Sequence, residues 1–319
     1  MSTVPPPGAH GGDGASVAQA LGIDPKSILD LSQSLNPVAL DPRPVIAAHL
    51  DAIGRYPDPR GAHEALAAVM GVNSDRLLLT NGGAEAITLV ANELGGTVSE
   101  PEFSLHPRGT GPKWRSNPHS PSGLLAETSD RADVWDEAFY PLATGQWSRG
   151  ERDAVVVGSL TKVLACPGLR VGYVLADPAF IETLRRHQPM WSLNGLASSA
   201  LPELLAPLDI ANDFVAIGVL RQRLRALLRR HGLTALPSDA NWLLVKHRGL
   251  REALALDGVV VRDCTNFGLV DTSRIAVPNE DGLERLERAL DRMDRRAEQT
   301  SGDVSSEVET LSNEKGTPQ

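Results

Sequence analysis

A regular alternation of short apolar runs with amphipathic helical stretches constrains the fold of this chain more than any other feature. Apolar runs of about four to eight residues, bounded by turn residues, are typical of strands buried on both faces of a sheet. The sequence predicts such strands in RLLLTNG (76–82), DAVVVGSL (153–160), LRVGYVLA (169–176), NWLLVKH (241–247) and GVVVRDC (258–264). Because helical stretches separate them, we expect an α/β fold with a mainly parallel sheet sandwiched by helices.

Several helix boundaries can be placed from capping residues. Asp177 and Pro178 form an N-cap and first-turn pair, which predicts a helix running to His187. Asn279 is expected to cap a helix over 280–296. The spacing of Leu and Val over 210–230 predicts one long helix, a candidate link between two lobes.

Composition excludes several classes of protein. The net charge of −9 argues against a nucleic-acid partner, and no apolar run is long enough to cross a membrane. Only Cys166 and Cys264 are present and no HExxH-like pairing occurs, so we expect neither disulfides nor a metal site. The opening residues lack a secretory signal, so a cytoplasmic location is expected.

The segment SLTKVLACPGLRVGY (159–173) carries the strongest chemical signal. After a predicted strand it places Ser159, Thr161, Lys162 and Arg170 in one turn-rich connection. A lysine can form an imine with a carbonyl, while two hydroxyls and an arginine can hold a dianion such as phosphate. The cluster therefore predicts a phosphorylated carbonyl compound bound at Lys162, although a lone lysine is more often an ordinary loop residue.

Three further segments carry weaker signals. The apolar run ADVWDEAF (132–139) ends in acids, and Asp136 would suit a protonated ring nitrogen or, alternatively, cap the next helix. Asn117, in the turn SNPHSPSG (116–123), is a candidate donor to a ring hydroxyl. In LLLTNGGAEAI (77–87) the backbone N–H groups of Gly83, Ala84 and Glu85 open a predicted helix and can bind an anion.

These elements, in this order, resemble the fold-type-I pyridoxal-phosphate (PLP) enzymes over about residues 8–295. The resemblance is closest to the branch of histidinol-phosphate aminotransferases and cobalamin-pathway threonine-phosphate decarboxylases. It implies the aspartate-aminotransferase fold, with PLP attached to Lys162 and Asp136 at its ring nitrogen. We expect an N-terminal arm (1–27), a PLP-binding large domain (28–208), a smaller α/β domain (209–298) and a disordered tail (299–319).

The resemblance also implies roles at the rim of the site. RYPDP (55–59) looks like the segment whose tyrosine reaches the cofactor phosphate of a partner subunit, which implies a homodimer with Tyr56 in that role. RDC (262–264) and SRIAVP (273–278) match two substrate-binding arginines, Arg262 and Arg274. The HGGD arm is similar to that of the decarboxylases and implies that His10, Gly11 and Gly12 hold a substrate phosphate, with Asn36 at the site edge.

The sequence departs from this family pattern in three places. His106 stands where the family has an aromatic residue stacked on the cofactor ring, and Phe139 replaces a tyrosine that binds the ring hydroxyl. Only ten residues separate His106 from Asn117, where the family usually has a helix and one or more strands. We therefore expect a shortened large domain with fewer strands and a more open entrance.

The sequence leaves three functions open. The arm favours a PLP-dependent decarboxylase of threonine phosphate or a close relative in the cobalamin pathway. Transamination of histidinol phosphate is the alternative, because sequence does not fix which substrate bond stands perpendicular to the ring. A catalytically silent PLP-fold partner protein is the alternative from another class.

Overall fold

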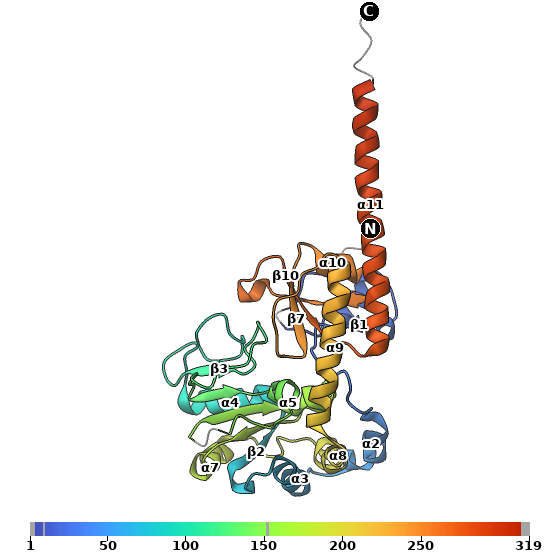
Figure 1. Cartoon of the computed structure of the whole chain (residues 1–319). Coiled ribbons are helices and arrows are strands. Elements are labelled where there is room, and N and C mark those ends of the chain that lie inside the picture. The colour runs from blue at the N-terminus through green and yellow to red at the C-terminus, as the bar shows by residue number, and fades with distance from the viewer. Residues whose placement is uncertain (1–3, 9, 151–152, 314–319) are drawn as a thin grey trace, which may run out of the picture.

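A five-stranded sheet forms the centre of the larger lobe in this computed structural model, which describes residues 4–8, 10–150 and 153–313, with side chains to Gln299 (Figure 1). The strand order is β2-β6-β5-β4-β3. β6 is antiparallel to both neighbours, and the other four strands share one direction. The strands are β2 (Leu77–Thr80), β3 (Trp114–Ser116), β4 (Val134–Asp136), β5 (Val155–Ser159) and β6 (Gly172–Leu175).

Apolar side chains project from both faces of this sheet, which explains the continuous apolar runs in the sequence. Leu77 and Leu79 pack into a core with α3 (Arg60–Met70) and α8 (Gly195–Leu205). Leu78, between them in sequence, points to the opposite face and packs with α4 (Gly82–Leu94) and α7 (Pro178–His187). The period-two alternation of side chains therefore places one helical layer on each face.

The smaller lobe has its own core. β7 (Trp242–Lys246), β10 (Thr272–Ala276) and β9 (Arg262–Asp263) form an antiparallel sheet, and β1 (Leu29–Asp30) pairs in parallel with β8 (Val259–Val260). This pairing brings β1 to the small lobe, although the boundary expected from sequence assigns residues from 28 onward to the large domain. The helices of this lobe are α1 (Gly14–Leu21), α10 (Leu250–Ala255) and α11 (Glu280–Asn313).

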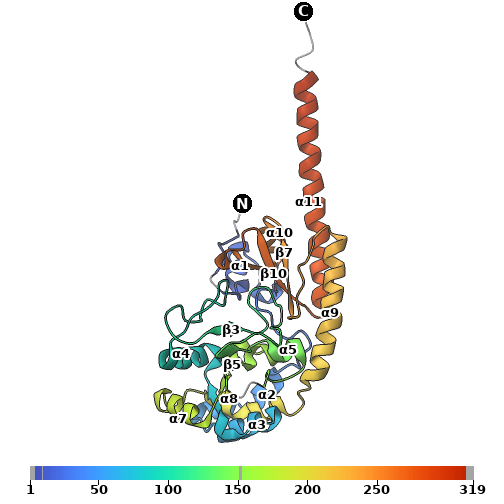
Figure 2. The ribbon, with the colours of Figure 1, turned by 60° about the vertical axis from the view of Figure 1, so that its left-hand side comes forward.

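The long helix α9 (Ile210–Arg230) spans the two lobes, as the sequence suggested (Figures 1 and 2). Ile210 and Ile217 pack near α5 (Tyr140–Thr144) of the large lobe. Leu224 and Leu228 lie in the core of the small lobe. This one helix therefore contributes buried apolar side chains to both lobes.

The helix starts predicted from capping residues are confirmed. The Asp177 carboxylate accepts a hydrogen bond from the Ala179 N–H (2.9 Å) at the start of α7, and the Asn279 side chain accepts one from the Gly282 N–H (2.9 Å). α11 continues to Asn313, into the stretch for which the sequence predicts disorder, and its distal part projects from the body in both views. None of the helices in the described residues is both long and apolar enough to span a membrane.

The remaining elements are short. Two helical segments, α2 (Arg43–Ala48) and η2 (Leu50–Gly54), pack beside α8 below the sheet, and α6 (Leu160–Val163) follows β5. Single 3₁₀ turns occur at η1 (Pro25–Ser27), η3 (Ser74–Arg76), η4 (Pro167–Leu169) and η5 (Thr265–Phe267).

The shortened part of the large lobe lies between α4 and β3. Residues 95–113 contain no helix or strand, and one bridge between Thr97 and Lys113 closes them into a loop. β3 is therefore the last strand at this end of the sheet, as expected from the small spacing between His106 and Asn117. The sequence predicts that a helix and one or more strands are missing here, and the structure has a loop in their place.

Candidate active site

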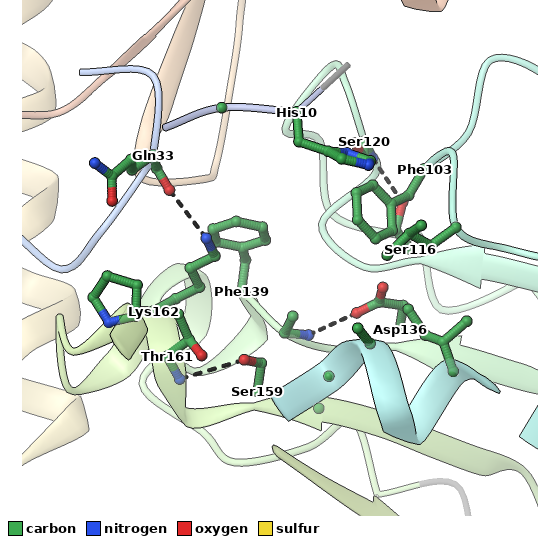
Figure 3. Close-up of a pocket in the computed structure, with 18 of the residues that line it drawn as sticks. His10, Gln33, Phe103, Ser116, Ser120, Asp136, Phe139, Ser159, Thr161 and Lys162 are labelled. Atoms are coloured by element: carbon green, nitrogen blue, oxygen red, sulfur yellow. Dashed lines mark hydrogen bonds between the residues drawn. The ribbon is translucent and has the colours of Figure 1, made fainter. Parts of the chain in front are cut away.

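A cavity of about 440 Å³ lies between the lobes, at the edge of the sheet where β2, β4 and β5 end. These three strands point the same way, so the residues that follow each of them meet at one edge. The residues that line it come from the arm, the sheet edge and the small lobe: His10, Gly11, Ser32, Gln33, Gly83, Ala84, Ile87, Phe103, Leu105, Ser116, Pro118, Ser120, Asp136, Ala138, Phe139, Val157, Gly158, Ser159, Thr161, Lys162, Pro167, Arg170, Arg262 and Arg274. Figure 3 shows many of them.

The floor of the cavity is built to hold an anion. The N-terminus of α4 points Gly83 and Ala84 toward it, next to Ser159. Gly82 has a φ of +76°, and a Cβ there would collide with the Arg170 guanidinium, so only glycine lets that side chain lie over the helix end. The Thr161 hydroxyl is buried and has no hydrogen-bond partner in the described structure. An anion at this point would supply one.

Lys162 lies beside this floor on the short helix α6. Its Nζ donates a hydrogen bond to the Gln33 carbonyl oxygen (3.2 Å) and lies 5.6 Å from the centre of the Phe139 ring (Figure 3). Burial lowers the pKa of the Lys162 amine to about 8, and nearby arginines, Arg274 first, act in the same direction. A much larger fraction of this amine is therefore neutral and nucleophilic near neutral pH than for an exposed lysine.

Asp136 ends β4 and is buried on the opposite side of the cavity. Its Oδ1 accepts a hydrogen bond from the Ala138 N–H (3.0 Å), and its Oδ2 lies 3.0 Å from Nε2 of His106. It is not the N-cap of α5, since Phe139 takes that position. Asp136 therefore does not cap α5, and it lines the cavity with a partner at each of its carboxylate oxygens.

Two arginines of the small lobe form the wall opposite the sheet. Arg262 and Arg274 are cross-strand neighbours on β9 and β10, and both are buried. Nε and Nη2 of Arg262 and Nε of Arg274 have no hydrogen-bond partner among the described residues. Burial and then the charge of Arg262 lower the pKa of Arg274 to about 9, and burial lowers that of Arg262 as well. Two desolvated guanidinium groups side by side are a strong site for an anion.

The N-terminal arm covers the cavity from the small-lobe side. His10 and Gly11 line it, and Gly11 lies so close to the Ser32 carbonyl that a Cβ would collide with it. Gly12 is not among the lining residues, but its N–H donates a hydrogen bond to the hydroxyl of Ser32 (2.7 Å), which does line the cavity. Arg251, a buried residue of α10, holds the arm through the Pro5 carbonyl (2.9 Å).

Three predicted residues lie away from the cavity lining. Glu85, whose backbone N–H was predicted to bind an anion, is not among the lining residues, and its carboxylate accepts a hydrogen bond from the Asn81 N–H (2.7 Å). Asn36 is buried under Lys162, where its side chain donates to the Val163 carbonyl (3.0 Å). Tyr56 is 75% exposed on the outside of the protein and stacks on Trp191, with ring centres 4.5 Å apart. Within one chain, Tyr56 therefore contributes nothing to the cavity.

The loop positions expected to contact the cofactor ring differ from the prediction. His106 does not line the cavity and lies behind Asp136, whereas Phe103, three residues earlier, forms part of the wall. Asn117 is also absent from the lining, since its Oδ1 accepts a hydrogen bond from the Ala126 N–H (2.9 Å). Ser120, three residues later, lines the cavity instead.

Sequence reasoning also missed Ser32 and Gln33, which lie in the segment SQSLNP next to the arm. Their polar character gave no signal, because Ser and Gln are common in loops. The sequence does mark Phe103, because it is an isolated aromatic residue in a polar segment. The resemblance to the PLP enzymes, however, predicts that the residue stacked on the ring is His106. Among the described residues, no group of three or more His, Cys, Asp or Glu side chains could hold a metal ion.

Comparison with known proteins identifies the family. The model of aminotransferase class I and II matches residues 116–292, more than half of the chain. Threonine-phosphate decarboxylase of Salmonella typhimurium is 30% identical over 88% of this chain and 95% of its own length. That alignment spans 349 positions, more than this chain has residues, so the relative carries residues without a counterpart here.

Two further relatives extend this picture. Histidinol-phosphate aminotransferase 1 of Dechloromonas aromatica is 25% identical over 86% of this chain and 93% of its own length. The crystal structure of histidinol-phosphate aminotransferase from Sinorhizobium meliloti, in complex with pyridoxal-5'-phosphate, has a TM-score of 0.75 at 17% identity and covers 89% of this chain and 95% of that one. The expected α/β fold of PLP-dependent transferases is thereby confirmed. The chain belongs to the class I and II aminotransferases, a family of PLP-dependent enzymes.

Proposed function

We propose that this protein acts on a phosphorylated amino acid, with PLP bound at Lys162, and that it is a threonine-phosphate decarboxylase or a close relative in cobalamin biosynthesis. The observation that carries the proposal is the pair of buried arginines, Arg262 and Arg274, which line the same cavity as Lys162 and have side-chain nitrogens without a hydrogen-bond partner among the described residues. A substrate with two anionic groups suits this arrangement. The arm residues His10 and Gly11 at the same cavity supply the further contacts expected for a phosphate.

The residues present fit the cofactor. The cradle formed by Gly83, Ala84, Ser159, Thr161 and Arg170 suits its phosphate, and the orphaned Thr161 hydroxyl gains a partner there. Asp136 lies where it can accept a hydrogen bond from a ring nitrogen, and Phe103 and Phe139 offer apolar contact to the ring. Neither His106 nor Asn117 belongs to this set in our proposal, and Ser120, which lines the cavity, would supply a polar group for the ring hydroxyl.

The chemistry divides between cofactor and protein. When bound, PLP withdraws electrons from the substrate α-carbon. Asp136 holds a proton on the ring nitrogen, Arg262 and Arg274 orient the substrate through its anionic groups, and the Lys162 amine moves protons at the α-carbon. The arm and the small lobe cover the cavity and limit access of water.

The competing activity is transamination of histidinol phosphate, which the relatives also support. Both activities need Lys162 and Asp136, so the distinction depends on the substrate orientation set by the two arginines and the arm. Purified protein should be assayed with threonine phosphate for carbon dioxide release, and with histidinol phosphate for turnover that depends on 2-oxoglutarate. Carbon dioxide release supports the decarboxylase. Turnover only with 2-oxoglutarate would reverse the assignment.

A silent partner protein with the PLP fold makes a different prediction, namely no turnover with any amino acid. The convergence of Lys162, Asp136, Thr161 and Arg170 on one cavity argues against it. A protein without chemistry gains nothing from a buried lysine amine or an unpartnered hydroxyl, since both cost stability.

The amine of Lys162 gives a test that depends on pH. Because its pKa lies near 8, well below the ordinary 10.5, the rate of covalent labelling of the apoprotein by PLP should rise with pH and level off above about pH 8. Labelling is measured by mass spectrometry after borohydride reduction at each pH. In Arg274→Met the midpoint should move upward, because the largest charge that lowers the pKa is removed. A midpoint near 10.5 in the unmodified chain would contradict this environment for Lys162.

We also propose a homodimer in which Tyr56 meets the site of the partner subunit. Tyr56, Ile53, Met190 and Trp191 are between 54% and 77% exposed, and Tyr56 stacks on Trp191. Such a cluster of large apolar side chains is unusual on a monomer and suits a second copy of the chain.

The dimer proposal predicts that Ile53→Glu weakens self-association by at least about tenfold, because it places a charge in an apolar contact. Sedimentation velocity over a range of concentrations measures the change. Val215→Glu, at a similarly exposed apolar residue on α9 outside this cluster, serves as the matched control and should leave association unchanged. A chain that is monomeric at all concentrations would exclude the dimer.

A further inference from the structure

The loop over residues 100–108 lies in the shortened part of the large lobe and has no helix or strand to support it. It nevertheless carries two residues that meet the site, Phe103 in the cavity wall and His106 behind Asp136. His106 is fully buried as a side chain, and its Nε2 lies 3.0 Å from the Asp136 carboxylate. Contacts both within the loop and from β3 hold these two side chains.

The guanidinium of Arg108 lies at the centre of this loop. Nη1 donates hydrogen bonds to the carbonyl oxygens of Phe103 (3.3 Å), Ser104 (3.2 Å) and His106 (2.8 Å). Nη2 donates to the Glu102 carbonyl (3.1 Å), and Nε donates to the Glu100 carboxylate (2.6 Å). One side chain thus donates to four carbonyl groups of a loop without secondary structure, one of which, that of Phe103, also accepts a hydrogen bond from the His106 N–H (3.1 Å).

Glu102 fixes the inner side of the same loop. Its buried carboxylate accepts hydrogen bonds from the N–H (2.9 Å) and the hydroxyl of Ser116, which is the residue of β3 paired with Asp136. Its Oε1 lies 3.8 Å from Nδ1 of His106. The imidazole therefore stands between two buried carboxylates, with its orientation set by the loop backbone that Arg108 holds.

We propose that Arg108 is a positioning residue of the active site, which replaces the missing structural elements by organising the 100–108 loop so that His106 holds Asp136 and Phe103 closes the cavity. Arg108 touches neither the cavity nor Asp136, and it acts through the loop backbone. The role of Asp136 toward the cofactor rests on the proposed function. The contact between His106 and Asp136 belongs to the protein alone.

The first test uses the apoprotein, labelled with ¹⁵N-histidine and studied by NMR. The buried Nε2–H of His106, identified by its absence in His106→Asn, should give a ring N–H signal protected from exchange by its hydrogen bond to Asp136. In Arg108→Ala and in Arg108→Lys, which keeps the charge but loses the planar fork, this signal should exchange at least about tenfold faster. Arg131→Ala is the matched control, since Arg131 also donates to two loop carbonyls, Thr128 and Asp130, away from this loop.

The second test uses the protein loaded with PLP. We expect Arg108→Lys to lower kcat by about tenfold to 100-fold with a smaller change in KM, and to shift the visible absorption of the bound cofactor. An unchanged His106 signal in both Arg108 variants overturns the proposal, as does an equal loss in Arg131→Ala, which would indicate general loosening. If the natural chain binds no PLP, the proposed function fails, while the NMR result still decides the role of Arg108.

Discussion

Replacing Lys162 with alanine is expected to abolish turnover, with a loss in kcat of at least about 10⁴-fold. The Lys162 amine is the nucleophilic group that lines the cavity between Asp136 and the arginines, and in the proposed mechanism the same amine also moves protons at the substrate α-carbon. The variant should still bind PLP weakly through the phosphate cradle. Borohydride reduction followed by peptide mapping should then find no cofactor attached to the chain.

The chain offers a clean control for this experiment, because it contains only five lysines. Lys246, exposed at the end of β7, is the matched site, and Lys246→Ala should keep both the covalent tag and the activity. Because Lys162 is buried without a carboxylate bonded to its Nζ, its truncation should not unfold the protein. A tag found at another lysine of the natural chain would remove the basis of the proposed active site.

Much of the candidate site was predictable because it follows from strand geometry. Asp136 and Ser159 each end a buried strand, and Gly83 opens the helix after a third. Parallel strands bring such positions to a single edge of the sheet, so residues distant in sequence meet there. The arginines of the small lobe were harder to place, and the resemblance to a family was needed to select Arg262 and Arg274 among many.

The loops were less predictable for a physical reason. Strand periodicity fixes which residues face the core, but a loop without regular hydrogen bonds has no period that sets its register. In both loops the cavity lining lies three residues from the predicted position, at Phe103 rather than His106 and at Ser120 rather than Asn117. Because the large lobe is shortened, no helix or strand next to this loop fixes which of its residues face the cavity. Arg108, which organises this loop instead, carries no signal in the sequence.

Arg274 makes the second prediction, in which activity and stability change in opposite directions. The guanidinium is fully buried and neighbours the like charge of Arg262, and burial lowers its pKa to about 9. Because the folded-state pKa lies well below the ordinary value for arginine, the folded protein binds this proton less tightly than the unfolded chain does. The charge therefore destabilises the fold at every pH below about 9, and the penalty decreases as pH rises above 9.

The Arg274 guanidinium lies over the Trp242 ring, 4.9 Å from its centre, and Arg274→Met removes the charge while leaving an apolar side chain of similar length against that ring. We expect the apoprotein to become more stable by about 1–4 kcal/mol at pH 7 in urea unfolding, while kcat/KM for the phosphorylated substrate falls by at least about 10²-fold. Arg225→Met is the matched control, since Arg225 donates to the Ala235 carbonyl outside the cavity. It should lose stability slightly and keep its activity. A less stable Arg274→Met would mean that this charge is satisfied within the protein, and the cavity would then lack the unpaired cation on which substrate recognition depends.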